Sequence, residues 1–254
     1  MTELLRLEGI TKKYGPNTVL ENVSFAIRKG EVVGLLGDNG AGKSTLVKIM
    51  SGVVPMTSGK FFWEDGLLEH VNREKTESLG VETIFQDSAL VPGMSIARNI
   101  FMGREVTNRL GFMKVKEMDR VASEILDSVV TIEGIKSSKQ LVQSLSGGQA
   151  QAVAIARAVH FKRSLLILDE PTSALAVRAT EALLSYLTQL KDEGVSSVLV
   201  THNLHHAFKV CDRHIVMNHG KKILDVRRED TSVEELTAAV VEGEAGVARI
   251  RAGK

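Results

Sequence analysis

The sequence predicts an α/β protein with a mostly parallel sheet, and three observations support this. Short apolar runs at 31–37, 164–171 and 195–202 are typical of strands buried on both faces. Segments with helical periodicity separate these runs along the chain. A glycine-rich loop joins the first run to a helix beginning near Ser44, where Leu46 starts the apolar pattern. Strands that alternate with helices favour a parallel sheet.

The remaining elements follow in chain order. The segments 4–15 and 19–27 alternate apolar and polar residues, which predicts two half-exposed strands before the first buried run. Residues 87–150 contain amphipathic stretches such as 113–129, and they predict a helical insertion. A further helix is expected at 180–194.

The last part of the chain predicts a hairpin and a helix. A pair of strands is expected at 214–225, around the turn Asn218-His219-Gly220. Beyond about residue 231 we expect one helix followed by a frayed end.

Composition limits the classes of function. The chain has 254 residues and a formal net charge of +1, so no overall field favours nucleic acid, and no nucleic-acid partner is expected. Its one cysteine, Cys211, excludes an intrachain disulfide and is expected to be a small buried residue. No signal peptide or membrane-spanning stretch is expected.

The loop GLLGDNGAGKST at 34–45 predicts a phosphate-binding site. Its pattern is Gly37-x4-Gly42-Lys43-Ser44, in which glycines let backbone N–H groups approach phosphate oxygens. The helix that follows adds the positive end of its dipole. Lys43 can reach the β- and γ-phosphates, the Ser44 hydroxyl can bind Mg²⁺, and Thr45 is a further phosphate contact. The sequence therefore predicts a P-loop nucleotide-binding core.

The run LLILDEP at 165–171 supplies two carboxylates at the end of a buried strand. Asp169 can hold Mg²⁺ through water, and Glu170 can orient or deprotonate an attacking water. A pair of acids after an apolar run is by itself just as often a strand that meets solvent. The phosphate-binding loop upstream is what favours the catalytic interpretation.

LSGGQ at 145–149 stands before a second helix, so it places further anion-seeking N–H groups at a helix N-terminus. One bound triphosphate needs only one such anion-binding site. Two of these sites in one chain suggest that each contacts a nucleotide held by a partner chain.

These motifs resemble the ATP-binding subunit of ATP-binding-cassette (ABC) transporters over about residues 3–230. Five motifs occur in the order of that family: GDNGAGKST with Lys43, TIFQD with Gln86, LSGGQ, LLILDE, and LVTHN with His202. The resemblance implies a P-loop core with an N-terminal antiparallel β subdomain at 1–86 and 150–230. It also implies a helical subdomain at 87–149, with 231–254 as a C-terminal helix and tail.

The resemblance also implies roles for single residues. Tyr14 would stack on adenine, Gln86 would sense Mg²⁺ and the γ-phosphate, and His202 would touch the γ-phosphate. Glu170, His202 and Gln86 are thus the expected catalytic residues, and Ser44, Gln86 and Asp169 the expected Mg²⁺ site. The expected ATP-contacting residues are Tyr14, Gly37, Asp38, Asn39, Gly40, Ala41, Gly42, Lys43, Ser44, Thr45, Ser146, Gly147, Gly148 and Gln149. Where the family usually has an aspartate that links the two sites, this chain has Ala176.

The resemblance also implies that two such chains form a head-to-tail dimer with two ATP molecules at the interface. A transporter of this kind lies at the cytoplasmic face of the membrane and drives separate permease subunits. The stretch VPGMSIARNIFMGRE at 91–105 is similar to the bacterial importers of ribose, xylose and fructose. We therefore expect sugar import with an extracytoplasmic sugar-binding protein. The ATPase of another ABC transporter, or a soluble ABC protein without a transport role, remains an alternative.

Overall fold

A computed structural model describes residues 2–85, 90–129, 135–160, 163–173 and 175–252. Its strands are β1 (Glu3–Tyr14), β2 (Asn17–Arg28), β3 (Val32–Leu36), β4 (Ser58–Trp63), β5 (Gly66–Leu67), β6 (Val81–Ile84), β7 (Leu165–Asp169), β8 (Ser196–Val200), β9 (Arg213–Asn218) and β10 (Lys221–Arg227). Its helices are α1 (Lys43–Met50), α2 (Arg73–Ser78), α3 (Ile96–Ile100), α4 (Val115–Val129), α5 (Gly147–His160), α6 (Val177–Asp192), α7 (Leu204–Val210), α8 (Val233–Glu242) and α9 (Glu244–Ala252), with short 3-10 helices at Val142–Ser144 and Arg228–Asp230.

The chain divides into two units. The first contains Met1–Thr83, Arg163–Glu170 and Leu187–Lys254, and the second contains Ile84–Lys162 and Pro171–Tyr186. The limits expected from the sequence, with the helical subdomain at 87–149, remain a prediction.

Two sheets build the first unit. A six-stranded sheet has the order β10-β9-β3-β8-β7-β6, in which β9, β3, β8 and β7 run parallel and β10 is antiparallel at the edge. A four-stranded sheet of order β2-β1-β4-β5 is antiparallel. This confirms the predicted fold class, a mostly parallel sheet with an N-terminal antiparallel sheet.

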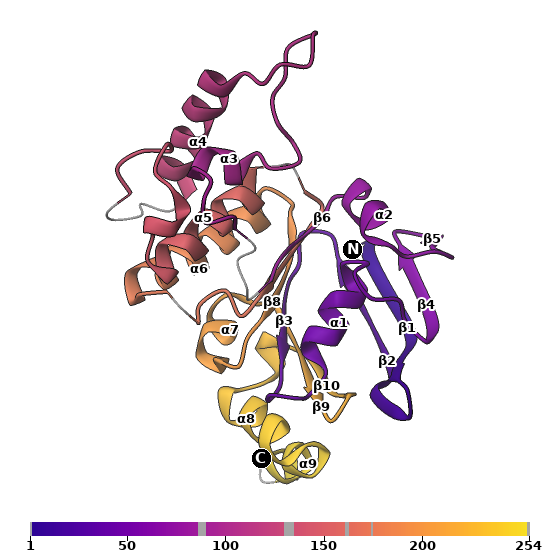
Figure 1. The fold of residues 1–254 in the computed structure, drawn as a ribbon. Coiled ribbons are helices and arrows are strands. Elements are labelled where there is room, and N and C mark those ends of the chain that lie inside the picture. The colour runs from indigo at the N-terminus through magenta and orange to yellow at the C-terminus, as the bar shows by residue number, and fades with distance from the viewer. Residues whose placement is uncertain (1, 86–89, 130–134, 161–162, 174, 253–254) are drawn as a thin grey trace. The chain divides into compact units, whose positions relative to one another are not determined.

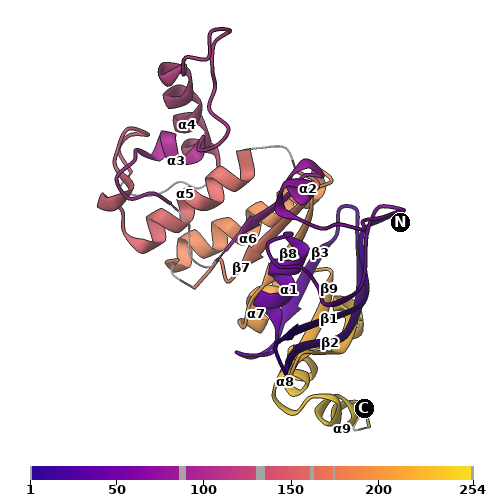
Figure 2. The same ribbon diagram turned by 45° about the vertical axis from the view of Figure 1, so that its right-hand side comes forward.

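The central strands are buried along their whole length. Every residue of β3, β7 and β8 is buried, as expected for strands covered on both faces. Helix α1 contacts a strand of each sheet, and Figures 1 and 2 show it beside β3 and near β1 and β2. The loop between β3 and α1 is thereby held at the carboxyl end of a buried strand.

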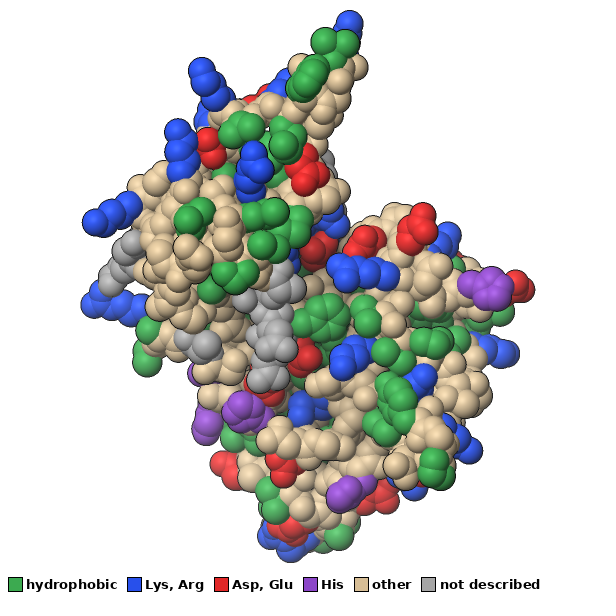
Figure 3. Space-filling view, in the orientation of Figure 1, with side chains coloured by type: hydrophobic (Ala, Val, Ile, Leu, Met, Phe, Trp, Pro, Cys, Tyr) green, Lys and Arg blue, Asp and Glu red, His purple; other side chains and the backbone are tan. Residues whose placement is uncertain are grey.

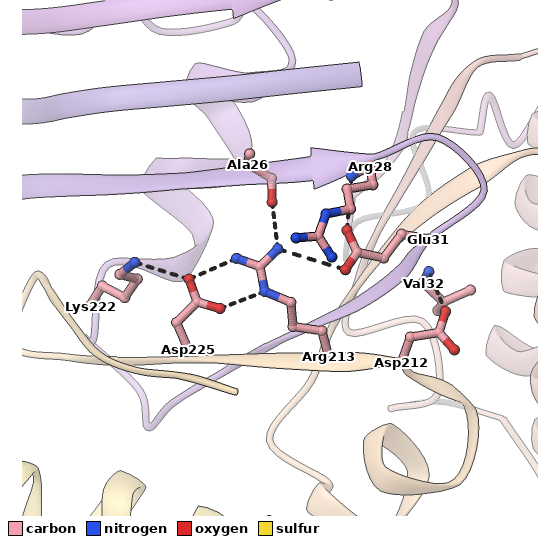
Figure 4. Close-up of polar contacts among 8 residues, drawn as sticks. All are labelled: Ala26, Arg28, Glu31, Val32, Asp212, Arg213, Lys222 and Asp225. Carbon is pink, nitrogen blue, oxygen red and sulfur yellow. Dashed lines mark hydrogen bonds and ion pairs between the residues drawn. The ribbon is translucent and has the colours of Figure 1, made fainter. Parts of the chain in front are cut away.

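A polar network fixes the other end of these strands (Figure 4). The Arg213 guanidinium donates to both carboxylate oxygens of Asp225 at 2.6 and 2.8 Å, and to the Ala26 carbonyl oxygen at 2.9 Å. Asp212 accepts the backbone N–H of Val32 at 3.1 Å, at the start of β3. Although burial raises the pKa of Asp225, hydrogen bonds from Arg213 and Lys222 bring it below its usual value. The network therefore ties β2, β3, β9 and β10 together.

Helices build most of the second unit. Helices α3, α4 and α5 pack against one another, and they share a cluster of buried side chains: Ile96, Ala97, Ile100, Phe101, Met118, Ala122, Ile125, Leu126, Val142, Val153 and Ala156. The helical insertion predicted from periodicity is present as these helices.

The C-terminal segment differs from the expectation of one helix and a frayed end. The chain forms two helices, α8 and α9, separated by Gly243 with φ of 66°. A Cβ at Gly246 would lie 2.5 Å from the Ala238 carbonyl oxygen, so glycine allows α9 to approach α8 closely. Arg251 also pairs with the buried Glu235 at 2.7 Å. The prediction of a frayed end was wrong, because these contacts depend on tertiary packing.

Candidate functional site

The loop between β3 and α1 is built around three glycines with positive φ. Gly37, with φ of 147°, would place a Cβ 2.3 Å from the Met217 carbonyl oxygen of β9. Gly42, with φ of 98°, would place one 2.7 Å from Leu20 of β2. Only at Gly40, with φ of 80°, is the space around a Cβ open. Glycine at position 37 is therefore required by the backbone of β9, whereas at Gly42 the positive φ disfavours a side chain and a Cβ would press on the end of the Leu20 side chain.

Lys43 occupies the centre of this loop. Its ammonium group donates to the carbonyl oxygens of Gly37 at 2.8 Å and Asp38 at 2.9 Å, and the side chain is buried. Burial lowers the pKa of Lys43, while the charges of Glu170 and Asp169 act in the opposite direction. The cation is thus positioned by the loop backbone, where it can meet an anion entering the loop.

Ser44 and Asp169 lie together at the start of α1 and the end of β7. Burial and the neighbouring charge of Glu170 raise the pKa of Asp169, whereas Lys43 and a hydrogen bond from Ser44 lower it. A hydroxyl and a carboxylate oxygen side by side fit Mg²⁺, which prefers one or two such ligands completed by phosphate oxygens and water. Across the part of the chain that the structure describes, no group of three or more His, Cys, Asp or Glu residues could hold a metal. The donor set therefore fits Mg²⁺ shared with phosphates rather than a closed metal cage.

Glu170 and His202 form a second pair in the same unit. The Glu170 Oε1 atom lies 3.0 Å from His202 Nδ1. Glu170 has a φ of 50°, which is strained for a side-chain-bearing residue, and its N–H donates to the Val200 carbonyl oxygen at 2.9 Å. Its side chain is nearly buried at 13% exposure, whereas that of His202 is 67% exposed. A carboxylate beside an imidazole at this edge could orient and deprotonate a water.

One residue near this site was missed by the sequence reasoning. Lys48 lies close enough to Asp169 to lower the pKa of that carboxyl group. It stands four residues after Ser44 on α1, so both side chains lie on the same face of the helix. That spacing was a signal in the sequence that could have identified it.

Tyr14 and Gln86 are two further residues predicted from the sequence. Tyr14, at the end of β1, is 46% exposed, and Lys12 Nζ lies 4.8 Å from the centre of its ring. Its ring is thus accessible for stacking. Gln86 lies outside the described residues.

LSGGQ lies in the second unit and caps α5. The Ser146 backbone N–H donates to Gln149 Oε1 at 2.9 Å, and the Gln149 N–H donates to the Ser146 hydroxyl at 3.3 Å. This reciprocal pair is a capping box. Ser146 and Gly147 are exposed, so the motif presents its polar atoms at the surface.

A phosphate-binding loop after β3, with two acids at the end of β7 in the same sheet, defines the class of P-loop nucleotide hydrolases. The family model described as ABC transporter matches residues 20–173. The chain is 43% identical over 93% of its length to the xylose/arabinose import ATP-binding protein XylG of Sulfolobus acidocaldarius, and covers 93% of that protein. The chain belongs to the ABC transporter family, as an ATP-binding protein that hydrolyses ATP.

Other relatives have different lengths. The chain is 34% identical to the fructose import ATP-binding protein FrcA of Rhizobium meliloti, with 92% of each chain covered. It is 38% identical to the ribose import ATP-binding protein RbsA 1 of Streptomyces avermitilis over 94% of this chain. That match covers 45% of the ribose protein, so this chain spans about half the length of such relatives.

Solved structures agree with this assignment. A dimeric structure of a post-hydrolysis state of the ATP-binding cassette MJ0796, bound to ADP and Pi, matches with a TM-score of 0.78. The identity is 27%, and the match covers 89% of this chain and 99% of that one. Within the described residues, no helix is both long and apolar enough to span a membrane.

Proposed function

We propose that this chain is the ATPase subunit of an importer for a monosaccharide, acting through a separate membrane permease. The proposal of ATP hydrolysis rests on one observation: Lys43, Asp169 and Glu170 lie together at one loop in the first unit. Support for the sugar comes from relatives whose names specify xylose or arabinose, fructose, and ribose. An importer also needs a sugar-binding protein outside the membrane, which would determine the cargo.

In this proposal the loop binds the triphosphate of ATP. Backbone N–H groups of residues 37–45 surround the β- and γ-phosphates, and the Lys43 ammonium neutralises part of their charge. Tyr14 stacks on the adenine. Ser44 and Asp169, with Gln86, would hold Mg²⁺, which when bound neutralises charge on the β- and γ-phosphates.

Hydrolysis then uses the pair Glu170 and His202. The oxygen of a water attacks the γ-phosphorus, and the bond from that phosphorus to the oxygen bridging to the β-phosphate breaks. The Glu170 carboxylate accepts a proton of the water, and the products are ADP and phosphate. His202, 3.0 Å from Glu170, orients the carboxylate and contacts the γ-phosphate.

A second copy of the chain completes each site. Ser146 and Gly148 are exposed or half-exposed on the second unit, and they would contact the γ-phosphate of ATP held by the other subunit. ATP favours the closed dimer because this contact exists only there, and hydrolysis removes the γ-phosphate and reopens the dimer. The permease, bound near Gln86 at the cytoplasmic face of the membrane, would be driven by this motion.

Glu170→Gln tests the hydrolytic part. The amide keeps the shape of the side chain but cannot accept the proton, so we expect ATP binding to persist and hydrolysis to fall about a hundredfold or more. With Mg²⁺ and ATP, light scattering should show a trapped dimer. Glu193→Gln, on an exposed glutamate that pairs with Gln189, is the matched control and should keep normal turnover. Normal hydrolysis by Glu170→Gln would refute the assigned role.

The transport part needs a separate measurement. The tagged chain should co-purify from detergent-solubilised membranes of its host with a polytopic permease and a sugar-binding protein. Recovery with soluble partners alone would contradict the transport proposal and leave the ATP chemistry intact.

A further inference from the structure

The second unit carries a short β-hairpin between α3 and α4, at residues 104–114. Thr107 and Met113 form an antiparallel bridge, and the Lys114 N–H donates to the Val106 carbonyl oxygen at 2.8 Å. The Asn108 N–H donates to the Phe112 carbonyl oxygen at 2.9 Å. We call residues 104–114 the apolar hairpin.

Asn108 organises the tip of the apolar hairpin. Its side-chain Oδ1 accepts the backbone N–H groups of Leu110 at 2.9 Å and Phe112 at 3.0 Å. Gly111, with φ of 82°, permits the turn, and its N–H donates to the Asn108 carbonyl oxygen at 3.0 Å. The tip is therefore held by backbone hydrogen bonds and by the Asn108 side chain.

Those large side chains face solvent. Leu110 is 81% exposed and Phe112 69%, and the neighbouring Met113 and Val115 are 46% and 42% exposed. Farther along α4 the pattern reverses, because Met118 belongs to the buried cluster of the unit. Figure 1 shows the apolar hairpin extending beyond α4, and hydrophobic side chains gather along this projection in Figure 3. A preorganised, exposed group of this kind is typical of an interaction surface.

The charges around the tip are mainly positive. Between residues 104 and 117 the chain has four basic and two acidic residues, namely Arg104, Arg109, Lys114, Lys116, Glu105 and Glu117. One acid and one base pair with each other, since Glu117 lies 3.1 Å from Lys114, and this leaves three basic residues and one acidic residue. Arg109, at the tip, and Lys116 are both exposed.

We propose that the apolar hairpin inserts Leu110 and Phe112 into the interface of an anionic lipid bilayer, with Arg109 and Lys116 against the headgroups. Large apolar side chains flanked by basic ones match a surface whose interior is apolar and whose face is negative. An anionic bilayer accounts for the apolar tip and the positive flank together. This contact holds the ATPase at the membrane without a permease and does not depend on which cargo is imported.

The test uses the full chain and protein-free vesicles. Flotation is compared on vesicles of phosphatidylcholine alone and on vesicles that also contain phosphatidylglycerol. We expect wild-type protein to float with the anionic vesicles, and the double variant Leu110→Ser with Phe112→Ser to bind them at least about tenfold more weakly. Arg109→Glu should weaken binding about fivefold or more on anionic vesicles and much less on neutral ones.

Controls separate this surface from the rest of the molecule. Val241→Ser removes a side chain that is 72% exposed on α8, and it should keep wild-type flotation. ATP binding is measured for each variant and should be unchanged, which shows that the fold and the nucleotide site are intact. Equal flotation of wild type and the double variant would overturn the proposal. Absence of wild-type binding to anionic vesicles would also overturn it and would indicate a protein partner for the hairpin.

Discussion

Replacing His214 by leucine should reduce the acid sensitivity of this protein. His214 is fully buried in β9, with its ring stacked on Phe208 at 5.7 Å between centroids and its Nδ1 atom 3.0 Å from the position of a Cβ on Gly34. Neither ring nitrogen has a hydrogen-bond partner among the residues that the structure describes. Burial, together with the charge of Arg228, lowers the pKa of His214 to about 4 from 6.5, against an opposing effect of Asp212.

Proton linkage gives the sign and the size of the effect of His214 on the free energy of unfolding. Because the folded pKa lies below the unfolded one, the unfolded chain binds the proton more tightly. The free energy of unfolding is therefore intact above about pH 6.5 and falls as pH decreases toward 4. A difference of about 2.5 pH units corresponds to about 3 kcal/mol at the acid limit, and to about 2 kcal/mol at pH 5. Leucine binds no proton, so His214→Leu should lose this part of the pH dependence.

Urea denaturation at about pH 7.5 and about pH 5 measures the effect. The fall in unfolding free energy between the two pH values should be smaller in His214→Leu by about 2 kcal/mol. The exposed His205 provides the control, since His205→Leu should keep the wild-type pH dependence. An unchanged pH dependence in His214→Leu would refute the assignment of a buried, neutral imidazole.

Three further substitutions test the nucleotide site. Gly37→Ala should lower the free energy of unfolding by about 3 kcal/mol, measured in urea, because its Cβ would lie 2.3 Å from the Met217 carbonyl oxygen; a fully stable variant would contradict this geometry. Lys43→Ala should weaken ATP binding at least about tenfold by calorimetry, with the exposed Lys60→Ala as control, and unchanged affinity would exclude the proposed phosphate contact. The exposed Ala176 lies at the N-cap position of α6, and its carbonyl oxygen accepts a hydrogen bond from the Thr180 N–H at 2.9 Å. Ala176→Asp should therefore raise stability by about 1 kcal/mol through capping and, if the aspartate links the two sites, raise ATP hydrolysis; unchanged turnover would mean that alanine is tolerated there.

Much of the fold could be predicted because local pattern determined it. Apolar runs predicted β3, β7 and β8, since strands covered on both faces consist mostly of apolar residues. Helical periodicity predicted α4 and α6. The hairpin at Asn218-His219-Gly220 was also confirmed as the β9–β10 turn.

The pairing of β1 with its more distant antiparallel partner, β4, was harder to predict. Strand β4 pairs Phe61 with Leu7 and Trp63 with Leu5, across more than fifty residues of chain. A register between distant segments depends on which faces meet in the folded state, and no local pattern records that.

The sequence by itself determined the family of this protein and its ATPase activity, and the order Gly37, Lys43, Asp169, Glu170 and His202 predicts which residues bind phosphate and hydrolyse ATP. Only the tertiary structure decided how they are held. It shows that Gly37 is required by its contact with the backbone of β9, and that Glu170 adopts a strained φ beside His202. It also shows that α9 packs on α8 through Gly246. These features depend on distances between segments far apart in the chain, and such distances arise only when the sheets and helices pack.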